Sequence, residues 1–255
     1  MELQGKVVFI TGASAGIGEA CARAFAELGC RLILSARRGE RLEALRRELL
    51  DSGVDVLVLP MDVRNRKEVE TAVDSLPPDW REIEVLVNNA GLALGLAPLH
   101  EGEVDDWDRM IDTNVKGLLY VTRAVLPGMV ERNRGHIINI GSIAGREVYR
   151  GGTVYCATKH AVRAITLGLR LDLLGTDIRV ITVDPGMVET EFSIVRFKGD
   201  VERAREVYEG LQPLTARDIA DAVVYCATRP PHVNISEMVV MPTHQASATK
   251  VYRQK

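Results

Sequence analysis

Tyr155 and Lys159 are four residues apart in the segment YCATK. On a helix, this spacing places both side chains on one face, with Cβ atoms about 5–6 Å apart. A phenol has a pKa of about 10, and lowering it by about 3 units takes about 4 kcal/mol. An ammonium about 4 Å away supplies an energy of that size at an effective dielectric of about 20. The two residues can therefore act together as a general base, although an isolated Tyr and Lys at this spacing usually lie on the surface.

A serine precedes this pair where a predicted strand gives way to a predicted helix. The apolar run 135–140 predicts the strand, Ser142 follows it, and the helix is expected over 153–174. A hydroxyl, a phenol and an ammonium would then meet at one strand end. Hydroxyl groups so placed can stabilise an oxygen on which negative charge develops.

The length allows one large α/β domain or two small ones, and the charge argues against several classes of partner. The chain has 255 residues, of which 46% are hydrophobic, and 22 glycines. That is enough apolar surface for one continuous core. The net charge of −3 gives no basic footprint for nucleic acid or an anionic membrane.

The four cysteines are dispersed and form no CxxC pair, and the five histidines are equally scattered. This pattern indicates neither a metal site nor a disulfide framework. The N-terminus lacks the pattern of a signal peptide, and no apolar run approaches the roughly 20 residues of a membrane span. We expect a reduced, cytoplasmic protein without a metal or a membrane.

A glycine-rich turn follows the first predicted strand, 6–11. The sequence TGASAGIG holds Gly12, Gly16 and Gly18, and an amphipathic helix pattern comes next. Such a turn brings backbone N–H groups and the positive end of a helix to a pyrophosphate. The spacing differs from G-x-G-x-x-G, and tight packing alone would also favour small residues here.

The second predicted strand, 31–36, ends at two arginines. A site for NAD usually presents an acidic residue there to the ribose 2′-hydroxyl. Arg37 and Arg38 occupy the position instead, and guanidinium groups bind phosphate in a bidentate manner. The alternative is a pair of solvated loop charges. Their place at a strand end favours NADP.

Polar side chains also mark the ends of later strands. Asp62 is placed to meet an adenine amino group or to cap the helix that follows. The segment 88–91, NNAG, suits either close approach by a ligand or a capped turn. Asn114 lies inside a long predicted helix, 104–132. Its side chain is expected either to make a local hydrogen bond or to mark a kink in the helix.

The alternation of strands and helices predicts one domain with a Rossmann-type, doubly wound parallel sheet of seven strands in an α/β/α arrangement. Ligands of such sheets bind beyond the carboxyl ends of the strands. The expected strands are 6–11, 31–36, 54–59, 83–87, 135–140, 178–183 and 235–241.

Two segments fall outside this alternation. Residues 187–212 are polar and charged, and a connection of that length is usually a lid or a binding element. Thr215 and Asp218 predict a capping box for the helix that follows. The tail 242–255 has no core pattern, which indicates either disorder or docking on another subunit.

Taken together, these motifs resemble the short-chain dehydrogenase/reductase family over essentially the whole chain. A narrower similarity, to the NADP-dependent 3-hydroxy acid dehydrogenases, lies in segments 88–95, 110–117, 123–141 and 192–198; segment 186–191 is one residue shorter than expected. The family motifs are TGASAGIG at 11–18, Asp62-Val63, NNAG at 88–91, Asn114, Ser142, YCATK at 155–159 and Pro185-Gly186.

The resemblance implies a role for each matching residue. Ser142 would hydrogen-bond the substrate oxygen, Tyr155 would exchange its proton, and Lys159 would lower the Tyr155 pKa. Asn114 would hold a water that links Lys159 to solvent. The implied NADP contacts are Gly12, Ser14, Gly16, Ile17 and Gly18 at the pyrophosphate, Arg37 and Arg38 at the 2′-phosphate, Asp62 at adenine, Asn89, Tyr155 and Lys159 near the ribose, and Pro185, Gly186, Val188 and Thr190 near the nicotinamide.

The implied reaction is hydride transfer between NADP(H) and C3 of a short 3-hydroxy acid, such as serine, L-allo-threonine or 3-hydroxypropionate, by a homotetramer. Arg146, Arg150 and Arg196 are candidates for holding the carboxylate, and each is by default a surface arginine. Another reductase of the same fold, acting on an acyl carrier or a sugar, would share the cofactor motifs. A non-catalytic NADPH sensor would not need the base.

Overall fold

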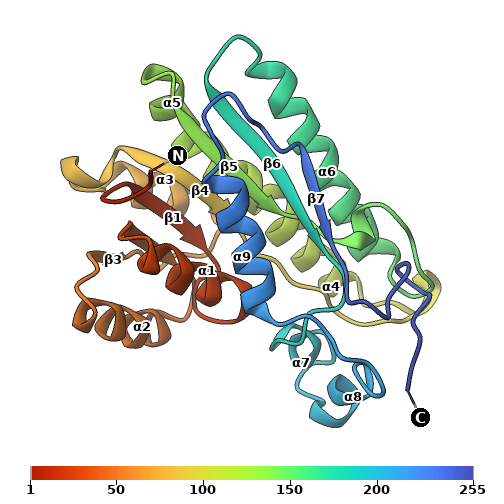
Figure 1. Ribbon diagram of the computed structural model, residues 1–255. Helices are drawn as coiled ribbons and strands as arrows, with labels where there is room; N and C mark the ends of the chain where they lie inside the picture. Colours follow the sequence, from red (N-terminus) through yellow and green to blue (C-terminus); the bar gives the residue numbers. More distant parts are fainter. Residues whose placement is uncertain (1, 255) are drawn as a thin grey trace.

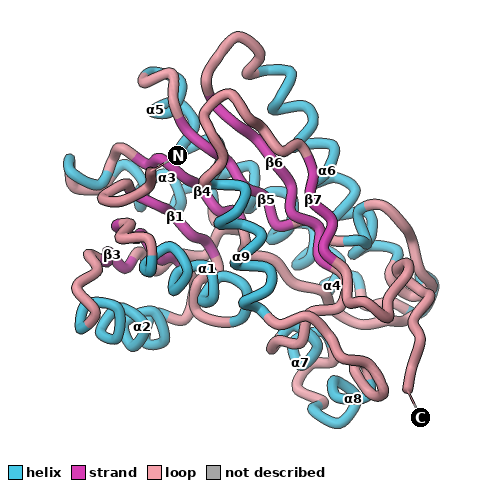
Figure 2. The backbone as a smooth tube through the Cα atoms, viewed as in Figure 1, coloured by secondary structure: helices cyan, strands magenta, loops and turns pink. Residues whose placement is uncertain are grey.

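The computed structural model describes residues 2–254. Its strands form one sheet in the order β3-β2-β1-β4-β5-β6-β7, and every neighbouring pair is parallel (Figures 1 and 2). The predicted doubly wound parallel sheet is therefore confirmed. The strands are β1 (Val7–Thr11), β2 (Arg31–Ser35), β3 (Val56–Val58), β4 (Ile83–Asn88), β5 (Gly135–Ile140), β6 (Ile178–Pro185) and β7 (Glu237–Val240).

Helices cover both faces of this sheet (Figure 1). One face carries α1 (Gly16–Glu27), α2 (Gly39–Asp51) and α9 (Ala216–Ala227), and the other carries α3 (Arg66–Asp74), α5 (Leu118–Glu131) and α6 (Thr153–Asp172). The remaining helical segments are η1 (Pro78–Trp80), η2 (Leu99–Glu101), α4 (Val104–Ile111), η3 (Asp112–Gly117), η4 (Ile143–Gly145), α7 (Phe192–Arg196) and α8 (Val201–Glu206).

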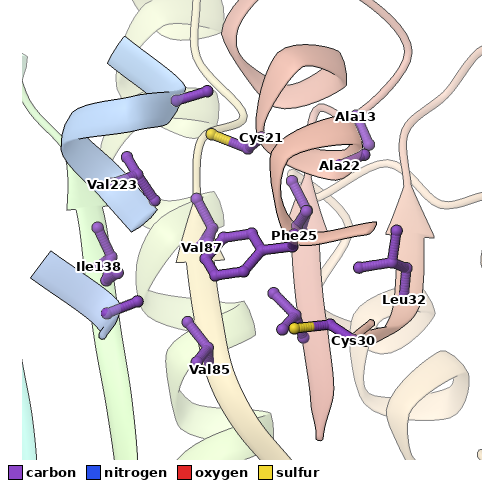
Figure 3. Close-up of a cluster of buried hydrophobic side chains, with 14 of the residues drawn as sticks. Ala13, Cys21, Ala22, Phe25, Cys30, Leu32, Val85, Val87, Ile138 and Val223 are labelled. Atoms are coloured by element: carbon purple, nitrogen blue, oxygen red, sulfur yellow. The ribbon is translucent and has the colours of Figure 1, made fainter. Parts of the chain in front are cut away.

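Each strand sends alternate side chains to opposite faces, and both faces are buried. In β1, Val8 and Ile10 pack with the α1–α9 side, whereas Val7 and Phe9 pack with the α3–α5 side. Figure 3 shows the first of these cores, where Phe25 of α1 lies over Val87 of β4. Two buried faces explain why the strands read as continuous apolar runs.

The long helix predicted over 104–132 is divided. A π-helical turn, η3, separates α4 from α5 and contains Asn114. The Asn114 side chain hydrogen-bonds the backbone of Leu92, which lies beyond β4. A π-turn of this kind is common at functional sites, because it displaces side chains from regular helical positions. Asn114 therefore fits both alternatives that its sequence position allowed: it lies at an irregular turn of the helix, and its side chain makes hydrogen bonds.

The segment 187–212 contains two short helices, α7 and α8, rather than continuous loop. The capping box at the start of α9 is confirmed: the Thr215 hydroxyl accepts from the Asp218 N–H, and the Asp218 carboxylate accepts from the Thr215 N–H.

The C-terminal tail packs on its own chain. The Gln245 side chain accepts a hydrogen bond of 2.8 Å from the Met187 N–H, and the Ala248 N–H donates to Glu147. Arg253 donates to the carbonyls of Val207 and Glu209. Within the described residues the tail is thus held against its own chain, and most of these contacts are with segment 187–212.

Within residues 2–254, no helix is long and apolar enough to cross a membrane. In the same residues, no group of three or more His, Cys, Asp or Glu side chains gathers in a way that could hold a metal ion.

One buried histidine couples the stability of the sheet to pH. His136 in β5 is 2% exposed, and both of its ring nitrogens are buried without a hydrogen-bond partner. Its register partner in β6 is Arg179. Burial first, and the charge of Arg179 second, lower the pKa of His136 well below 6.5. His136 is therefore neutral in the folded protein.

We predict that stability falls as the pH drops below about 6.5, because there the unfolded chain takes up a proton that folded His136 refuses. Wild type should lose about 1 kcal/mol more than His136→Leu between about pH 7.5 and pH 5.5. Urea unfolding at both pH values measures the difference. His100→Gln, at an exposed histidine, is the control. An identical pH dependence in wild type and His136→Leu would contradict the prediction.

Candidate active site

The turn between β1 and α1 is held against the end of β4 by Asn89. The Asn89 side-chain amide donates to the carbonyls of Thr11 (2.9 Å) and Gly12 (3.2 Å). Gly12 has φ of +66°, and a Cβ there would lie 2.9 Å from the Cα of Ala90. A Cβ on Gly18 would collide with the Gly12 carbonyl oxygen. Tight packing thus explains two of the three glycines, and the same packing fixes the turn.

The start of α1 is open to an anion. Ala15 is the N-cap of α1 and provides no side-chain cap, so the N–H groups of the first turn point outward uncapped. Ile17 packs on the core beneath. Gly16 faces Thr190, whose Cβ lies 3.3 Å from the position of a Cβ on Gly16. The turn and the end of β6 therefore border one space that suits a pyrophosphate.

Arginines at the end of β2 converge on one carboxylate. Arg38 and Arg41 donate to the two oxygens of Glu191 at 2.8 and 2.6 Å, and Arg38 also donates to the Ser14 hydroxyl at 3.1 Å. These guanidinium groups can thus bind a single anion beside the glycine turn. Arg37 is exposed. Sequence reasoning missed Arg41, although it lies in the first turn of α2, three residues after Arg38.

Asp62 does not cap α3, so that alternative was wrong. Asn65 is the N-cap, and its side chain accepts from the Glu68 N–H. The Asp62 carboxylate instead binds Arg64 at 2.6–3.0 Å. Burial of the Asp62 carboxyl raises its pKa, but the hydrogen bonds from Arg64 outweigh this effect and leave the pKa of Asp62 lowered.

The loop after β6 carries the residues expected beside a nicotinamide. Pro185 ends β6, and the Gly186 N–H donates to Val240 of β7 at 2.8 Å. Val188 forms an isolated bridge with Leu214, and its carbonyl accepts from Tyr208. With Thr190 against Gly16, this loop lies over the edge where β1, β5 and β6 end.

Ser142 and Tyr155 lie together, as predicted. Ser142 follows β5 after Gly141 and caps η4, accepting from the Ala144 N–H at 3.1 Å. Its side chain also hydrogen-bonds the Tyr155 phenol. Burial raises the pKa of Tyr155, while the charge of Arg196 and the bond with Ser142 lower it to a smaller extent. Tyr155 is therefore a neutral phenol, which is the form that donates a proton.

Lys159 does not lower the pKa of Tyr155 in the way expected from the spacing. Its Nζ lies 6.0 Å from the Tyr155 ring centroid and donates to the Ile140 carbonyl at 2.8 Å. Burial lowers the pKa of Lys159 to about 8, and the charge of Asp184 opposes this. Burial raises the pKa of Tyr155 and lowers that of Lys159, and the expectation from spacing alone left burial out.

Asn114 connects this pair to the end of β4. Its side chain donates to the Thr158 hydroxyl at 3.0 Å, and Thr158 donates to the Tyr155 carbonyl at 2.7 Å. Asn114 Oδ1 and Lys159 Nζ lie 3.3 and 3.7 Å from the position of a Cβ on Gly91. The two polar groups thus flank Gly91, and only a glycine leaves the space between them open.

The three candidate arginines occupy different surroundings. Arg146 forms ion pairs of 2.8 Å with Asp184 and Glu237, which occupy its guanidinium group. Arg150 is exposed. Arg196 lies over the Tyr155 ring, with its guanidinium carbon 5.1 Å from the centroid.

Arg196 has a free donor in the site. Its Nη2 donates to the Tyr149 hydroxyl at 2.6 Å, and its Nε is buried without a hydrogen-bond partner. Stacking on Tyr149, Tyr155 and Phe192 holds the guanidinium plane. A buried donor without a partner is costly unless a ligand supplies an acceptor. The arrangement suits a small anion next to Tyr155.

A cavity of about 270 Å³ opens between α4, α6 and α7 beside these groups. Its volume matches a small molecule rather than a long chain. Among the side chains that line it are Leu94, Asp106, Met110, Tyr155, Arg196 and Lys198.

Comparisons with known proteins identify the family. The short chain dehydrogenase family model matches residues 6–200. An NADP-dependent 3-hydroxy acid dehydrogenase of Salmonella typhi is 58% identical, over 95% of this chain and 97% of that protein. Sulfoacetaldehyde reductase 2 of Chromohalobacter salexigens is 48% identical, over 94% and 95%. The closed form of serine dehydrogenase complexed with NADP+ is 52% identical, over 97% and 100%, with a TM-score of 0.92.

Proposed function

The chain belongs to the short-chain dehydrogenase family, and we propose that it transfers a hydride between NADP(H) and C3 of a short 3-hydroxy acid. The similar proteins named as 3-hydroxy acid and serine dehydrogenases support this substrate class. The observation that carries it is Arg196, a half-buried cation beside Tyr155 whose Nε donor is buried without a partner. A carboxylate is the ligand that such a group requires.

The residues at the strand ends fit NADP. The uncapped start of α1, with Gly12, Gly16, Ile17 and Gly18, would hold the pyrophosphate, and the arginines beside Ser14 would hold the 2′-phosphate. Glu191 shows that Arg38 and Arg41 can meet on one anion. Asp62, Asn89, Lys159, Pro185, Gly186, Val188 and Thr190 complete the proposed contacts. When bound, NADP(H) supplies the hydride.

In the direction of reduction, Tyr155 would donate its proton to the carbonyl oxygen at C3. Burial keeps the phenol protonated, which suits this role. Ser142 would donate to the same oxygen as negative charge develops. Lys159 and Asn114, which flank Gly91, would return a proton to Tyr155 through water held between them. In the direction of oxidation the same groups would act in reverse.

Substrate selection would rest on Arg196 and Tyr149. A carboxylate on Arg196 places the C3 oxygen of a three- or four-carbon acid within reach of Tyr155, because the guanidinium group stacks on that ring. A sulfonate has the same charge, and the similarity to a sulfoacetaldehyde reductase makes a sulfonated aldehyde the second candidate. An uncharged acyl thioester would leave the Arg196 charge without a counter-charge, which disfavours an acyl-carrier reductase.

We also propose that the enzyme is a cytoplasmic homotetramer. The outer surfaces of α5 and α6 expose apolar side chains, including Leu119, Leu167 and Leu171. Leu171 is 76% exposed, which is unfavourable unless another subunit covers it. All four cysteines are buried free thiols, as expected in a reducing compartment.

The role of the arginines at the end of β2 can be tested by comparing how tightly the protein binds NADPH and NADH. Replacing Arg37 and Arg38 together by alanine should weaken NADPH binding by about 100-fold, since charge-assisted bonds contribute about 1.5–3 kcal/mol each. NADH binding should change little. Fluorescence titration of each reduced cofactor measures both constants. Arg47→Ala, an exposed arginine of α2, is the control. Equal losses for NADPH and NADH would refute the assignment.

Arg196 can be tested with charged and neutral substrates. Arg196→Gln should raise KM for a short 3-hydroxy acid by about 10- to 100-fold, the loss expected for a charge-assisted hydrogen bond. Activity on a neutral aldehyde of similar size should be largely retained. Steady-state assays with a 3-hydroxy acid, a sulfonated alcohol and a neutral alcohol separate the candidates. If Arg150→Gln, at the exposed neighbour, had the larger effect, the proposed carboxylate site would be wrong.

A further inference from the structure

Arg196 belongs to a segment, 191–198, that crosses the mouth of the cavity. One backbone group of the segment faces the rest of the site: the Arg196 carbonyl accepts a hydrogen bond of 2.9 Å from the Gly95 N–H. The guanidinium group itself is held by the aromatic rings around it and by the Tyr149 hydroxyl. The contacts at the end of the segment hold the backbone that carries this side chain.

Lys198 ends this segment in an unfavourable backbone conformation. Its φ is +55°, in the left-handed region that glycine prefers and that lysine adopts only at a cost. The residue lies just after α7, where glycine would cap the helix without strain. Strain of this kind persists when the side chain has a specific contact, and it concentrates at functional sites.

The contact of Lys198 is a buried carboxylate on the opposite wall. Its Nζ forms an ion pair of 2.7 Å with Asp106, whose side chain is 10% exposed, compared with 56% for Lys198. Asp106 lies in the first turn of α4, where the helix dipole favours a negative charge. Both residues line the cavity. The pair thus joins the segment that carries Arg196 to the helix across the cavity.

We propose that Lys198 and Asp106 form a positioning pair that sets Arg196 for the substrate carboxylate. The ion pair holds one side of the segment, and the Gly95–Arg196 backbone bond holds the other. With both in place, the backbone of Arg196 stays where its guanidinium group lies over the Tyr155 ring. This inference rests on the proposed function, because it concerns how the site binds an anionic substrate.

A different role for Lys198 is attraction of anions by its charge, and the two roles predict opposite results at Asp106. If charge alone mattered, Asp106→Asn would make the mouth more positive and lower KM for an anionic substrate. If the pair positions Arg196, Asp106→Asn releases Lys198 and raises KM. Lys198→Gly raises KM in both cases, so the carboxylate is the informative partner.

The experiment compares Lys198→Gly, Asp106→Asn and the double variant with wild type. Each single change should raise KM for a short 3-hydroxy acid by about 10-fold, a coupling within the range of neighbouring charged pairs. The double variant should be no worse than either single one. Values of kcat, KM for a neutral alcohol, and NADPH binding by fluorescence should stay near wild type. Lys198→Gly relieves backbone strain, so loss of folding does not explain its effect.

Asn133→Gly provides the matched control. Asn133 has φ of +47° after α5 and lies outside the cavity lining, so its replacement should leave KM unchanged. A lower KM in Asp106→Asn, or unchanged KM in both single variants, would overturn the positioning pair. Those results would leave the proposed function intact as long as wild type oxidises 3-hydroxy acids and Arg196→Gln raises KM. Failure of wild type on every anionic substrate would instead refute the proposed function.

Discussion

Burial of Tyr155 is the constraint on which the chemistry of this site depends. A phenol removed from water resists ionisation, and here burial outweighs the favourable charge of Arg196 and the hydrogen bond with Ser142. The residue therefore rests as a proton donor. The same burial lowers the pKa of Lys159 to about 8, so the lysine can gain or lose a proton near neutral pH. Burial thus shifts the pKa values of two proton-carrying groups at once.

The fold supplies this burial through contacts between distant segments. Asn89 fixes the β1–α1 turn to the end of β4, Asn114 fixes η3 to Leu92, and both bonds bring backbone to the carboxyl edge of the sheet. Segment 191–198 then covers the edge. Its first residue, Glu191, pairs with Arg38 and Arg41, and its last, Lys198, pairs with Asp106. The covering segment is thereby linked both to the arginines proposed for the cofactor and to the wall of the substrate cavity.

Local patterns in the sequence predicted the sheet and the capping box of α9, because these follow from periodicity and from spacing within one element. The proximity of Ser142 to Tyr155 was predicted from the place of both residues where a strand gives way to a helix. The role of Lys159 could not be predicted in this way, since its partner, the Ile140 carbonyl, lies on β5 and burial determines its pKa. Likewise, Arg146, Arg150 and Arg196 were equivalent by sequence neighbourhood. Only tertiary contacts separated an arginine paired with Asp184 from one with a free donor beside Tyr155. The π-turn at Asn114 also required a partner 22 residues away.

The central claim is that buried, neutral Tyr155 is the group that transfers the proton to and from the substrate oxygen. Comparing Tyr155→Phe with Tyr149→Phe tests it most directly, because Tyr149 lies in the same site but contacts Arg196. Turnover with NADPH should fall by about 100- to 10,000-fold in Tyr155→Phe, the range for a lost general acid. NADPH binding should persist, and Tyr149→Phe should mainly raise KM. Near-normal turnover in Tyr155→Phe would contradict the account.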